Sequence, residues 1–304
     1  MTIKHLVLSG GGPTGFLTYG AARILEKEGF WKYEDIQSIY GTSIGGFMGV
    51  VLSLGYEWAI LDDYFIKRPW EKVIEVSPTT IFDALSTKGV LGEQFVNDSL
   101  EPLLSAKGLT GESTLKDLFE FNHIDVHLYT TAINQHKLQK IDISHKTHPE
   151  LAIVKAISMS TAYPFAFRPV CMEDECYIDG GLVNNYPLRD CIDQTNCTEA
   201  EVLAFKNVWV MDRYMVTDES SVFDFMLVLI RKMQREIDTE DSQGEIQNTV
   251  RCLVEDLDGF PAWMDALGTE HMRQKLIDRG SQQGSLFLSY IRSQGGVEEL
   301  RECV

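Results

Sequence analysis

The sequence has little positive charge and no long hydrophobic run. Its 304 residues include 27 Lys and Arg against 45 Asp and Glu, which gives a formal net charge of −18. Because nucleic acids and anionic membranes are themselves negative, electrostatic attraction is not expected to bring this chain to either. No stretch approaches the roughly 20 apolar residues of a membrane-spanning helix. The nearest, residues 223–230, is interrupted by Asp224. We therefore expect a soluble chain with no nucleic-acid partner.

The amino terminus and the cysteines carry no sign of secretion. Residues 1–9 enter a short apolar run without the small-residue cleavage site of a signal peptide. We therefore expect an intracellular, cytoplasmic protein, at most peripheral to membranes. The six cysteines lack paired Cys-x-x-Cys spacing, and no nearby His completes a zinc site. The expectation is free thiols, with no metal and no cofactor.

Two successive strand, turn and helix patterns open the chain. Residues 5–9 form a short apolar run that ends in glycines, and residues 16–28 have helical spacing of apolar positions. Residues 36–40 and 45–54 repeat this pattern. Such units imply parallel strands joined by right-handed crossovers. The predicted fold class is α/β, with a mainly parallel central sheet flanked by helices.

The middle of the chain differs from this pattern. Residues 56–125 show no clear strand, and we predict a helical cap-like insertion there. Its aromatic side chains are candidates for an acyl pocket or for contact with a lipid interface, although each can equally be core packing. A capping box at Thr114 and Asp117 predicts a helix through Phe121. The aromatic residues are Trp58, Tyr64, Phe65, Trp70 and Phe82.

The remaining chain is predicted to complete one domain over residues 1–304, with its core motifs between 5 and 190. From about 218 to 304 we expect a helical extension in which the apolar run 223–230 is buried in part. Strands are predicted at 126–133, 138–143 and 208–211, a two-stranded hairpin at 171–179, and a helix at 150–159.

The turn Gly41-Thr42-Ser43-Ile44-Gly45 separates the second predicted strand from its helix. A serine hydroxyl becomes a useful nucleophile only when it is exposed, next to a base and close to donors for an oxyanion. A sharp strand-to-helix turn supplies the exposure, and the two glycines avoid collisions inside it. Ser43 is therefore the candidate nucleophile. The alternative is an ordinary residue at a helix start, beside packing glycines.

A glycine-rich loop, residues 10–15, follows the first predicted strand. Consecutive glycines allow backbone amides to point into one space, and the next helix adds its positive amino-terminal end. This loop predicts an anion cradle. It also matches the Gly-x-Gly-x-x-Gly pattern of dinucleotide sites. That alternative is weaker, because Tyr40-Gly41-Thr42-Ser43 stands where a ribose-binding acid is expected.

The base is less obvious than the nucleophile. The one His beyond residue 148 is His271, in a polar stretch, so a Ser-Asp-His triad is poorly supported. The histidines at 123–148 are expected at the surface or at strand edges. Asp179 follows an apolar strand, precedes Gly180-Gly181, and could take the Ser43 proton if burial raised its pKa from near 4. The alternative is a turn residue that bonds its own backbone.

Four segments in order resemble the patatin-like phospholipase family: 10–15, 41–45, 158–169 and 177–187. The resemblance implies a three-layer α/β/α fold and hydrolysis of lipid esters, of phospholipase A or lysophospholipase type. It also implies Ser43 as nucleophile, Asp179 as base and the glycine loop as oxyanion hole. The implied oxyanion residues are Gly10, Gly11, Gly12, Thr14 and Gly15, and the supporting glycines are Gly41, Gly45, Gly180 and Gly181.

Position 14 departs from the family pattern. The family usually has Arg or Lys just before the last glycine of the loop, whereas this chain has Thr14. Backbone donors alone can still lower a barrier by a few kcal/mol, so we expect reduced or altered activity. A lipid acyltransferase with the same residues and a weakly active or non-catalytic lipid-binding homologue remain alternatives. The expected partners are a lipid ester or phospholipid and a transiently contacted membrane interface.

Overall fold

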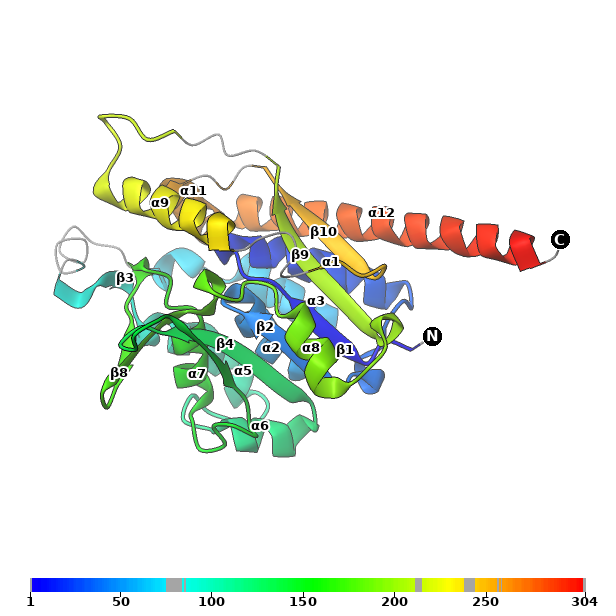
Figure 1. Cartoon of the computed structure of the whole chain (residues 1–304), viewed down its shortest axis with the longest axis horizontal. Coiled ribbons are helices and arrows are strands. Elements are labelled where there is room, and N and C mark those ends of the chain that lie inside the picture. The colour runs from blue at the N-terminus through cyan, green and yellow to red at the C-terminus, as the bar shows by residue number, and fades with distance from the viewer. Residues whose placement is uncertain are drawn as a thin grey trace.

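The computed structural model describes residues 2–74, 84, 86–210, 215–237, 244–255, 257 and 259–302. These residues form an eight-stranded sheet in the order β10-β9-β1-β2-β4-β8-β7, with β5 paired to β4 (Figure 1). The strands are β1 (His5–Leu8), β2 (Ser38–Thr42), β4 (Asp125–Ala132), β5 (Gln139–Ile143), β7 (Val170–Met172), β8 (Glu175–Asp179), β9 (Val202–Trp209) and β10 (Thr249–Val254).

Most neighbouring strands are parallel. From β10 through β9, β1 and β2 to β4, every pairing runs in the same direction. In contrast, β5 and β8 run antiparallel to β4, and β7 runs antiparallel to β8. Parallel neighbours need crossover connections, and α1 (Gly15–Lys27) lies between β1 and β2. The predicted α/β class with a mainly parallel sheet is confirmed.

Both faces of the sheet are buried, which makes three layers. Leu6 and Leu8 of β1 pack into a large apolar cluster with α1 and α2 (Ile44–Ser53). Val7, between them, packs on the other face with Leu188 of α8 (Leu188–Thr195). Because successive side chains of a strand point to opposite faces, a strand buried on both sides requires helices on both sides.

The predicted insertion is mostly helical where it is described. Its helices are α3 (Trp58–Asp62), the π-helical η3 (Asp63–Lys67), η4 (Trp70–Lys72), α5 (Glu93–Ser105) and α6 (Leu115–Asn122). The predicted capping box is present, since the Asp117 N–H donates to Thr114 Oγ1 at 3.1 Å and the Thr114 N–H to Asp117 Oδ2 at 2.7 Å. Phe82 lies outside the described residues.

A short strand in the insertion was missed. Residues Gly89–Leu91 form β3, which pairs in parallel with β6 (Phe165–Phe167) as a separate two-stranded sheet. Three residues are too few to show a period of two. The predicted helix at 150–159 is α7, over Ile153–Ser160.

The C-terminal part is not entirely helical. It contains α9 (Val222–Ile237), α11 (Gly259–Gly268) and α12 (Glu270–Glu302), but also β10, and β9 begins at residue 202, not at 208. The prediction of an all-helical extension is therefore wrong. Alternation was present in the sequence, since Val250, Cys252 and Val254 are buried while Arg251 and Leu253 are exposed. Six residues beside long helical patterns gave that alternation little weight.

The last helix belongs to the core, because α12 packs closely on α1. A Cβ atom added at Gly20 would lie 2.0 Å from the carbonyl oxygen of Ile277, and one at Gly280 would lie 2.0 Å from that of Leu17. Only glycine permits this approach of two backbones. Over the described residues, no helix is both long and apolar enough to cross a membrane.

The expectation of six free thiols is wrong at one pair. Cys171 and Cys176 form a disulfide across the β7–β8 hairpin. The two residues are direct cross-strand partners with their Cα atoms 4.0 Å apart, so the hairpin itself brings them together. Cys191, Cys197 and Cys252 are free, and Cys303 lies outside the described residues. Among the residues described, no group of three or more His, Cys, Asp or Glu is arranged to hold a metal ion.

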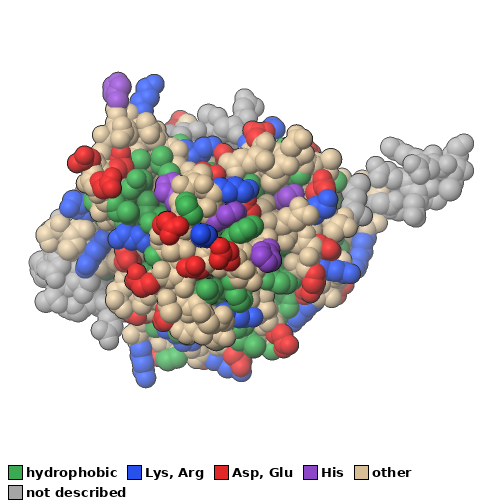
Figure 2. All heavy atoms as spheres, turned by 90° about the horizontal axis from the view of Figure 1, so that it is seen from below, with side chains coloured by type: hydrophobic (Ala, Val, Ile, Leu, Met, Phe, Trp, Pro, Cys, Tyr) green, Lys and Arg blue, Asp and Glu red, His purple; other side chains and the backbone are tan. Residues whose placement is uncertain are grey.

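Charges of both signs share the surface. Figure 2 shows acidic and basic side chains interspersed over the face seen from below, with apolar side chains in small groups between them. A continuous basic surface is therefore not a feature of this face. This agrees with the net charge of −18.

Candidate active site

Ser43 lies in a sharp turn between β2 and α2. Its backbone has φ 55° and ψ −126°, a conformation that non-glycine residues rarely adopt and that is found at functional sites. A Cβ atom at Gly41 would lie 2.5 Å from the Gly45 carbonyl oxygen, and one at Gly45 would lie 2.2 Å from that of Leu8. Both glycines are therefore sterically required. The predicted strand-to-helix turn is the geometry observed.

Asp179 contacts Ser43 directly. Its Oδ2 accepts a hydrogen bond from the Ser43 hydroxyl at 2.5 Å, and its Oδ1 accepts one from the Gly181 N–H at 2.7 Å. Asp179 is 1% exposed. Burial raises the pKa of this carboxyl to about 7, although the bonds from Ser43 and Gly181 oppose the shift. A carboxylate with this pKa can accept a proton near neutral pH.

Strand β4 brings the two residues together. Thr42 of β2 pairs with Tyr129, and Asp179 of β8 pairs with the next residue, Thr130. Because β5 occupies the other edge of β4 at the same two residues, β2 and β8 share one edge and meet end to end. The strand ends therefore place Ser43 beside Asp179, 136 positions later in the chain.

Three of the five predicted oxyanion residues face Ser43. Gly10, Gly11 and Gly12 line one cavity with Ser43 and Asp179. The Gly10 N–H already donates to the Asn185 carbonyl oxygen at 3.1 Å. The backbone donors oriented by the turn are therefore sought at Gly11 and Gly12, whose φ angles are 153° and 62°.

Thr14 and Gly15 support the loop and do not line this cavity. The Thr14 side chain is fully buried, and its Oγ1 would lie 2.4 Å from a Cβ atom added at Gly11. Gly15 packs under α2, since a Cβ atom there would lie 2.4 Å from Ile44 Cγ1. Any effect of Thr14 on chemistry must therefore act through the conformation of the loop.

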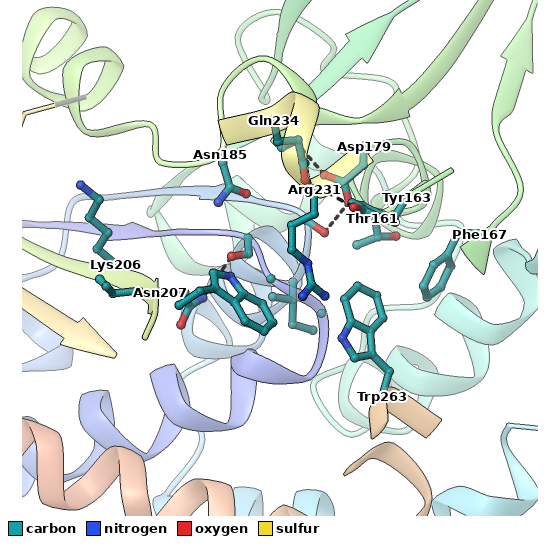
Figure 3. A pocket seen from close by; sticks show the side chains of 18 of the residues that line it. Thr161, Tyr163, Phe167, Asp179, Asn185, Lys206, Asn207, Arg231, Gln234 and Trp263 are labelled. Atoms are coloured by element: carbon teal, nitrogen blue, oxygen red, sulfur yellow. Dashed lines mark hydrogen bonds between the residues drawn. The ribbon is translucent and has the colours of Figure 1, made fainter. Parts of the chain in front are cut away.

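The Ser–Asp cavity, named for Ser43 and Asp179, has a volume of about 520 Å³ (Figure 3). Much of its wall comes from late segments that carried no recognisable motif: Lys206, Asn207 and Trp209 of β9, Arg231 and Gln234 of α9, and Trp263 of α11. Asn207 also holds the glycine loop, because its Nδ2 donates to the Gly10 carbonyl oxygen at 3.1 Å. Sequence reasoning missed these residues, since each is isolated in its own segment.

A family model for patatin-like phospholipases matches residues 6–192. The chain belongs to the patatin-like phospholipase family. Among curated relatives, "Uncharacterized protein R571" of Acanthamoeba polyphaga mimivirus is 29% identical over 199 residues, which are 64% of this chain and 64% of that protein. "Probable lipid hydrolase 463L" of Invertebrate iridescent virus 6 is 26% identical over 195 residues, again 64% of each. The chain thus spans slightly under two thirds of these relatives.

A bacterial relative and a solved structure extend the comparison. The "cGAMP-activated phospholipase" of Vibrio cholerae is 28% identical over 202 residues, which cover 61% of this chain and 55% of that protein. The crystal structure of VipD from Legionella pneumophila has a TM-score of 0.55 at 18% identity, over 95% of this chain and 67% of that one. The latter likeness shows the patatin-like fold. Family membership supports hydrolysis of lipid esters.

Ser160 is a further supporting residue of this patatin-like site. Its Oγ accepts the Ser43 N–H at 3.0 Å and donates to the Tyr129 carbonyl oxygen at 2.7 Å. The Ser43 amide is therefore directed into the protein, and the turn is tied to β4. Ser160 lies in the segment 158–169 that carried part of the resemblance, although its role was not predicted.

A second, apolar cavity adjoins the first. The apolar cavity has a volume of about 90 Å³ and shares Ile44, Phe167 and Trp263 with the Ser–Asp cavity. Its far wall includes aromatic and aliphatic side chains of the insertion, namely Phe65, Trp70, Phe95 and Val96. Some aromatic residues of residues 56–125 therefore do face a cavity next to Ser43.

The histidines do not contribute to the site, and one is not at the surface. His271 is exposed on α12 and is absent from the described lining of the Ser–Asp cavity. His127, predicted to be superficial, is 3% exposed and lies 3.1 Å from Asp125 and 2.9 Å from Asp142. Burial alone would lower its pKa, but hydrogen bonds and charge from both aspartates raise the pKa to about 9. Strand pairing of β4 with β5 assembles this cluster.

Proposed function

We propose that this chain hydrolyses carboxylic esters of lipids, with Ser43 as nucleophile and Asp179 as base. The observation that carries the proposal is the 2.5 Å hydrogen bond from the Ser43 hydroxyl to a buried Asp179 in a glycine-lined cavity. Membership in the patatin-like phospholipase family supports the substrate class. A relative named as a probable lipid hydrolase supports it further.

The proposed reaction has two halves. Ser43 Oγ attacks the ester carbonyl carbon while Asp179 takes the hydroxyl proton, and the Gly11 and Gly12 amides stabilise the oxyanion. Collapse breaks the bond to the alcohol, which leaves with the proton from Asp179, and the acyl group remains on Ser43. Water then attacks the acyl-serine, Asp179 accepts its proton, and the fatty acid and free Ser43 are released.

The apolar cavity is proposed to hold part of the acyl chain. Its wall is almost wholly carbon, and it opens beside Ser43 across Ile44, Phe167 and Trp263. Burial of methylene groups in such a cavity is worth about 0.8 kcal/mol each. The insertion thus serves the site that the core motifs form.

Helix α9 is proposed to contact the lipid surface. Val222, Phe225, Leu229 and Met233, here called the α9 outer row, are 59%, 44%, 39% and 52% exposed. Their spacing places them on one side of the helix. The expected burial of 223–230 is therefore only half right, because Leu227, Val228 and Ile230 are buried on the opposite side.

The position of this row favours a lipid aggregate as its occupant. Arg231 and Gln234 project from the buried side of α9 into the Ser–Asp cavity. A surface that covers the outer row therefore lies directly over the cavity. An apolar helix face at an interface binds through buried apolar area and needs no basic patch.

Covalent labelling tests the dyad. A fluorophosphonate probe should label the wild type, and Ser43→Ala should abolish labelling, whereas Ser285→Ala, an exposed serine on α12, should label normally. Asp179→Asn should label at least 1,000-fold more slowly. An unlabelled wild type that binds lipid would instead indicate a non-catalytic lipid-binding protein. Acyl transfer to an added alcohol in preference to water would indicate an acyltransferase.

A further inference from the structure

Arg231 brings a positive charge into the Ser–Asp cavity from outside the family match. It lies on α9, whereas the match ends at residue 192, and it is 9% exposed. Figure 3 shows its guanidinium in the middle of the labelled side chains, beside Trp263. We propose that Arg231 forms a phosphate-binding site in this cavity, which takes the phosphodiester of a lipid head group. The proposal rests on the proposed function for its substrate but not for its binding chemistry.

The guanidinium is held by an aromatic ring. Its Cζ lies 4.3 Å from the centroid of the Trp209 ring, a cation–π contact. Stacking of this kind engages the flat face of the guanidinium and fixes its plane, while its N–H groups project from the edge. A planar fork of N–H donors matches two phosphate oxygens, so an oriented Arg is suited to this anion.

Arg231 and Asp179 act on the same small region. Burial raises the pKa of the Tyr163 hydroxyl, the charge of Arg231 opposes that shift, and the charge of Asp179 adds to it. The same hydroxyl donates to Gln234 Oε1 at 3.3 Å. Gln234 follows Arg231 by three residues on one side of α9, and its amide nitrogen is a second donor toward the cavity.

The other cations of the cavity wall already have an acidic neighbour there. Lys206 lies 3.1 Å from Glu245 and Arg251 lies 2.5 Å from it, and all three residues line the cavity. In a chain with a net charge of −18, general attraction for phosphate is weak, so binding must come from local contacts. Arg231 supplies such a contact near Ser43.

The site also accounts for the departure at position 14. The family pattern would place a cation in the loop, but Thr14 is fully buried and faces Gly11. The positive charge of this chain instead reaches the cavity from α9. Tertiary packing thus supplies from a distant segment what the loop lacks.

A pair of matched substrates tests the site. Diheptanoyl phosphatidylcholine and diheptanoylglycerol, both used as dispersed monomers, share acyl chains and differ in the phosphate. Arg231→Gln should lower kcat/KM for the phospholipid by about 10- to 100-fold. The same variant should change kcat/KM for the neutral ester by less than about threefold, and Arg231→Lys should recover part of the loss. Arg292→Gln, an exposed cation on α12, is the control.

Inorganic phosphate separates the head group from the free anion. If the site takes free phosphate, the anion should inhibit neutral-ester hydrolysis competitively in the wild type and not in Arg231→Gln. If it takes only a head group, glycerophosphocholine should inhibit and phosphate should not. Equal losses on both substrates, or no loss on either, would overturn the proposal.

A binding measurement keeps the inference separate from catalysis. In the Ser43→Ala background, glycerophosphocholine should raise Tm, and Arg231→Gln should remove that rise. If the wild type hydrolyses neither ester, the proposed function fails while this measurement still decides the phosphate site. Arg231→Lys should keep wild-type Tm, so loss of folding cannot imitate loss of binding.

Discussion

Two regions build the Ser–Asp cavity in different ways. Residues 5–190 contribute Ser43, Asp179 and the glycine loop, each inside a short motif whose glycines are required by close backbone contacts. Residues 202–268 contribute Asn207, Arg231 and Trp263 from a strand and two helices, with no motif at all. The first region fixes reacting atoms, where a small displacement is costly. The second fixes the walls, where side-chain type matters more than backbone position.

The largest expected effect follows from disturbing the turn in the first region. Gly45→Ala places a methyl group 2.2 Å from the Leu8 carbonyl oxygen, so the turn around Ser43 must shift. Fluorophosphonate labelling should slow by more than about 100-fold. Gly268→Ala, at the end of α11, has nothing within 4 Å and should label like the wild type. Normal labelling of Gly45→Ala would contradict the steric argument.

The pH dependence of activity tests the buried carboxyl. Because Asp179 must be ionised to accept a proton and its pKa is about 7, kcat/KM should rise about tenfold per pH unit below 7 and level off above. A rate profile governed by a group near pH 4 would show that burial does not control this base. The neutral ester avoids titration of the substrate.

The same carboxyl predicts a stability effect of opposite sign. Its folded pKa lies above the unfolded value of about 3.9, so the folded state binds more protons between pH 4 and 7 and loses stability as pH rises through that range. Asp179→Asn should therefore be more stable than the wild type at pH 8, by about 1–3 kcal/mol. Urea unfolding at pH 4 and pH 8 measures the difference. A variant that is less stable at pH 8 would refute it.

The second region should show an effect confined to aggregated substrate. Phe225→Glu with Leu229→Glu removes two apolar side chains from the α9 outer row and should weaken binding to phosphatidylcholine vesicles about tenfold or more. Hydrolysis of a soluble short-chain ester should not change. Leu286→Glu, at a 71% exposed position on α12, is the matched control. If vesicle binding is unchanged and the variant shifts from dimer to monomer in sedimentation, the row binds a second copy instead.

The smallest effect concerns the cluster around His127, remote from both regions. Its pKa of about 9 exceeds the unfolded value of about 6.5, so its stabilising charge is fully present below pH 6.5 and is lost as pH rises through 9. His127→Gln should lower the free energy of unfolding by about 1–3 kcal/mol at pH 6 and by less at pH 9.5. His271→Gln, an exposed position, should have no effect at either pH.

Much of the fold was predictable because periodicity and turns are local. The strands β1, β2, β4 and β5 and the helices α1, α2, α6 and α7 were expected near their observed bounds. Elements with weak local signals were not: β3 has three residues, β10 lies between helices, and most of β9 was missed. The disulfide was also missed, because it depends on which residues of a hairpin stand opposite each other.

The sequence by itself determined the candidate residues Ser43 and Asp179, since both stand in glycine-marked turns whose backbone requirements are written in adjacent positions. It did not determine their contact. Only the tertiary structure places Asp179 beside Ser43, by joining β2 and β8 end to end along one edge of β4. It alone also brings Arg231, Asn207 and Trp263 to the cavity, because residues far apart in sequence meet only through strand order and helix packing. Local chemistry is encoded locally, whereas a cavity wall is a property of the whole fold.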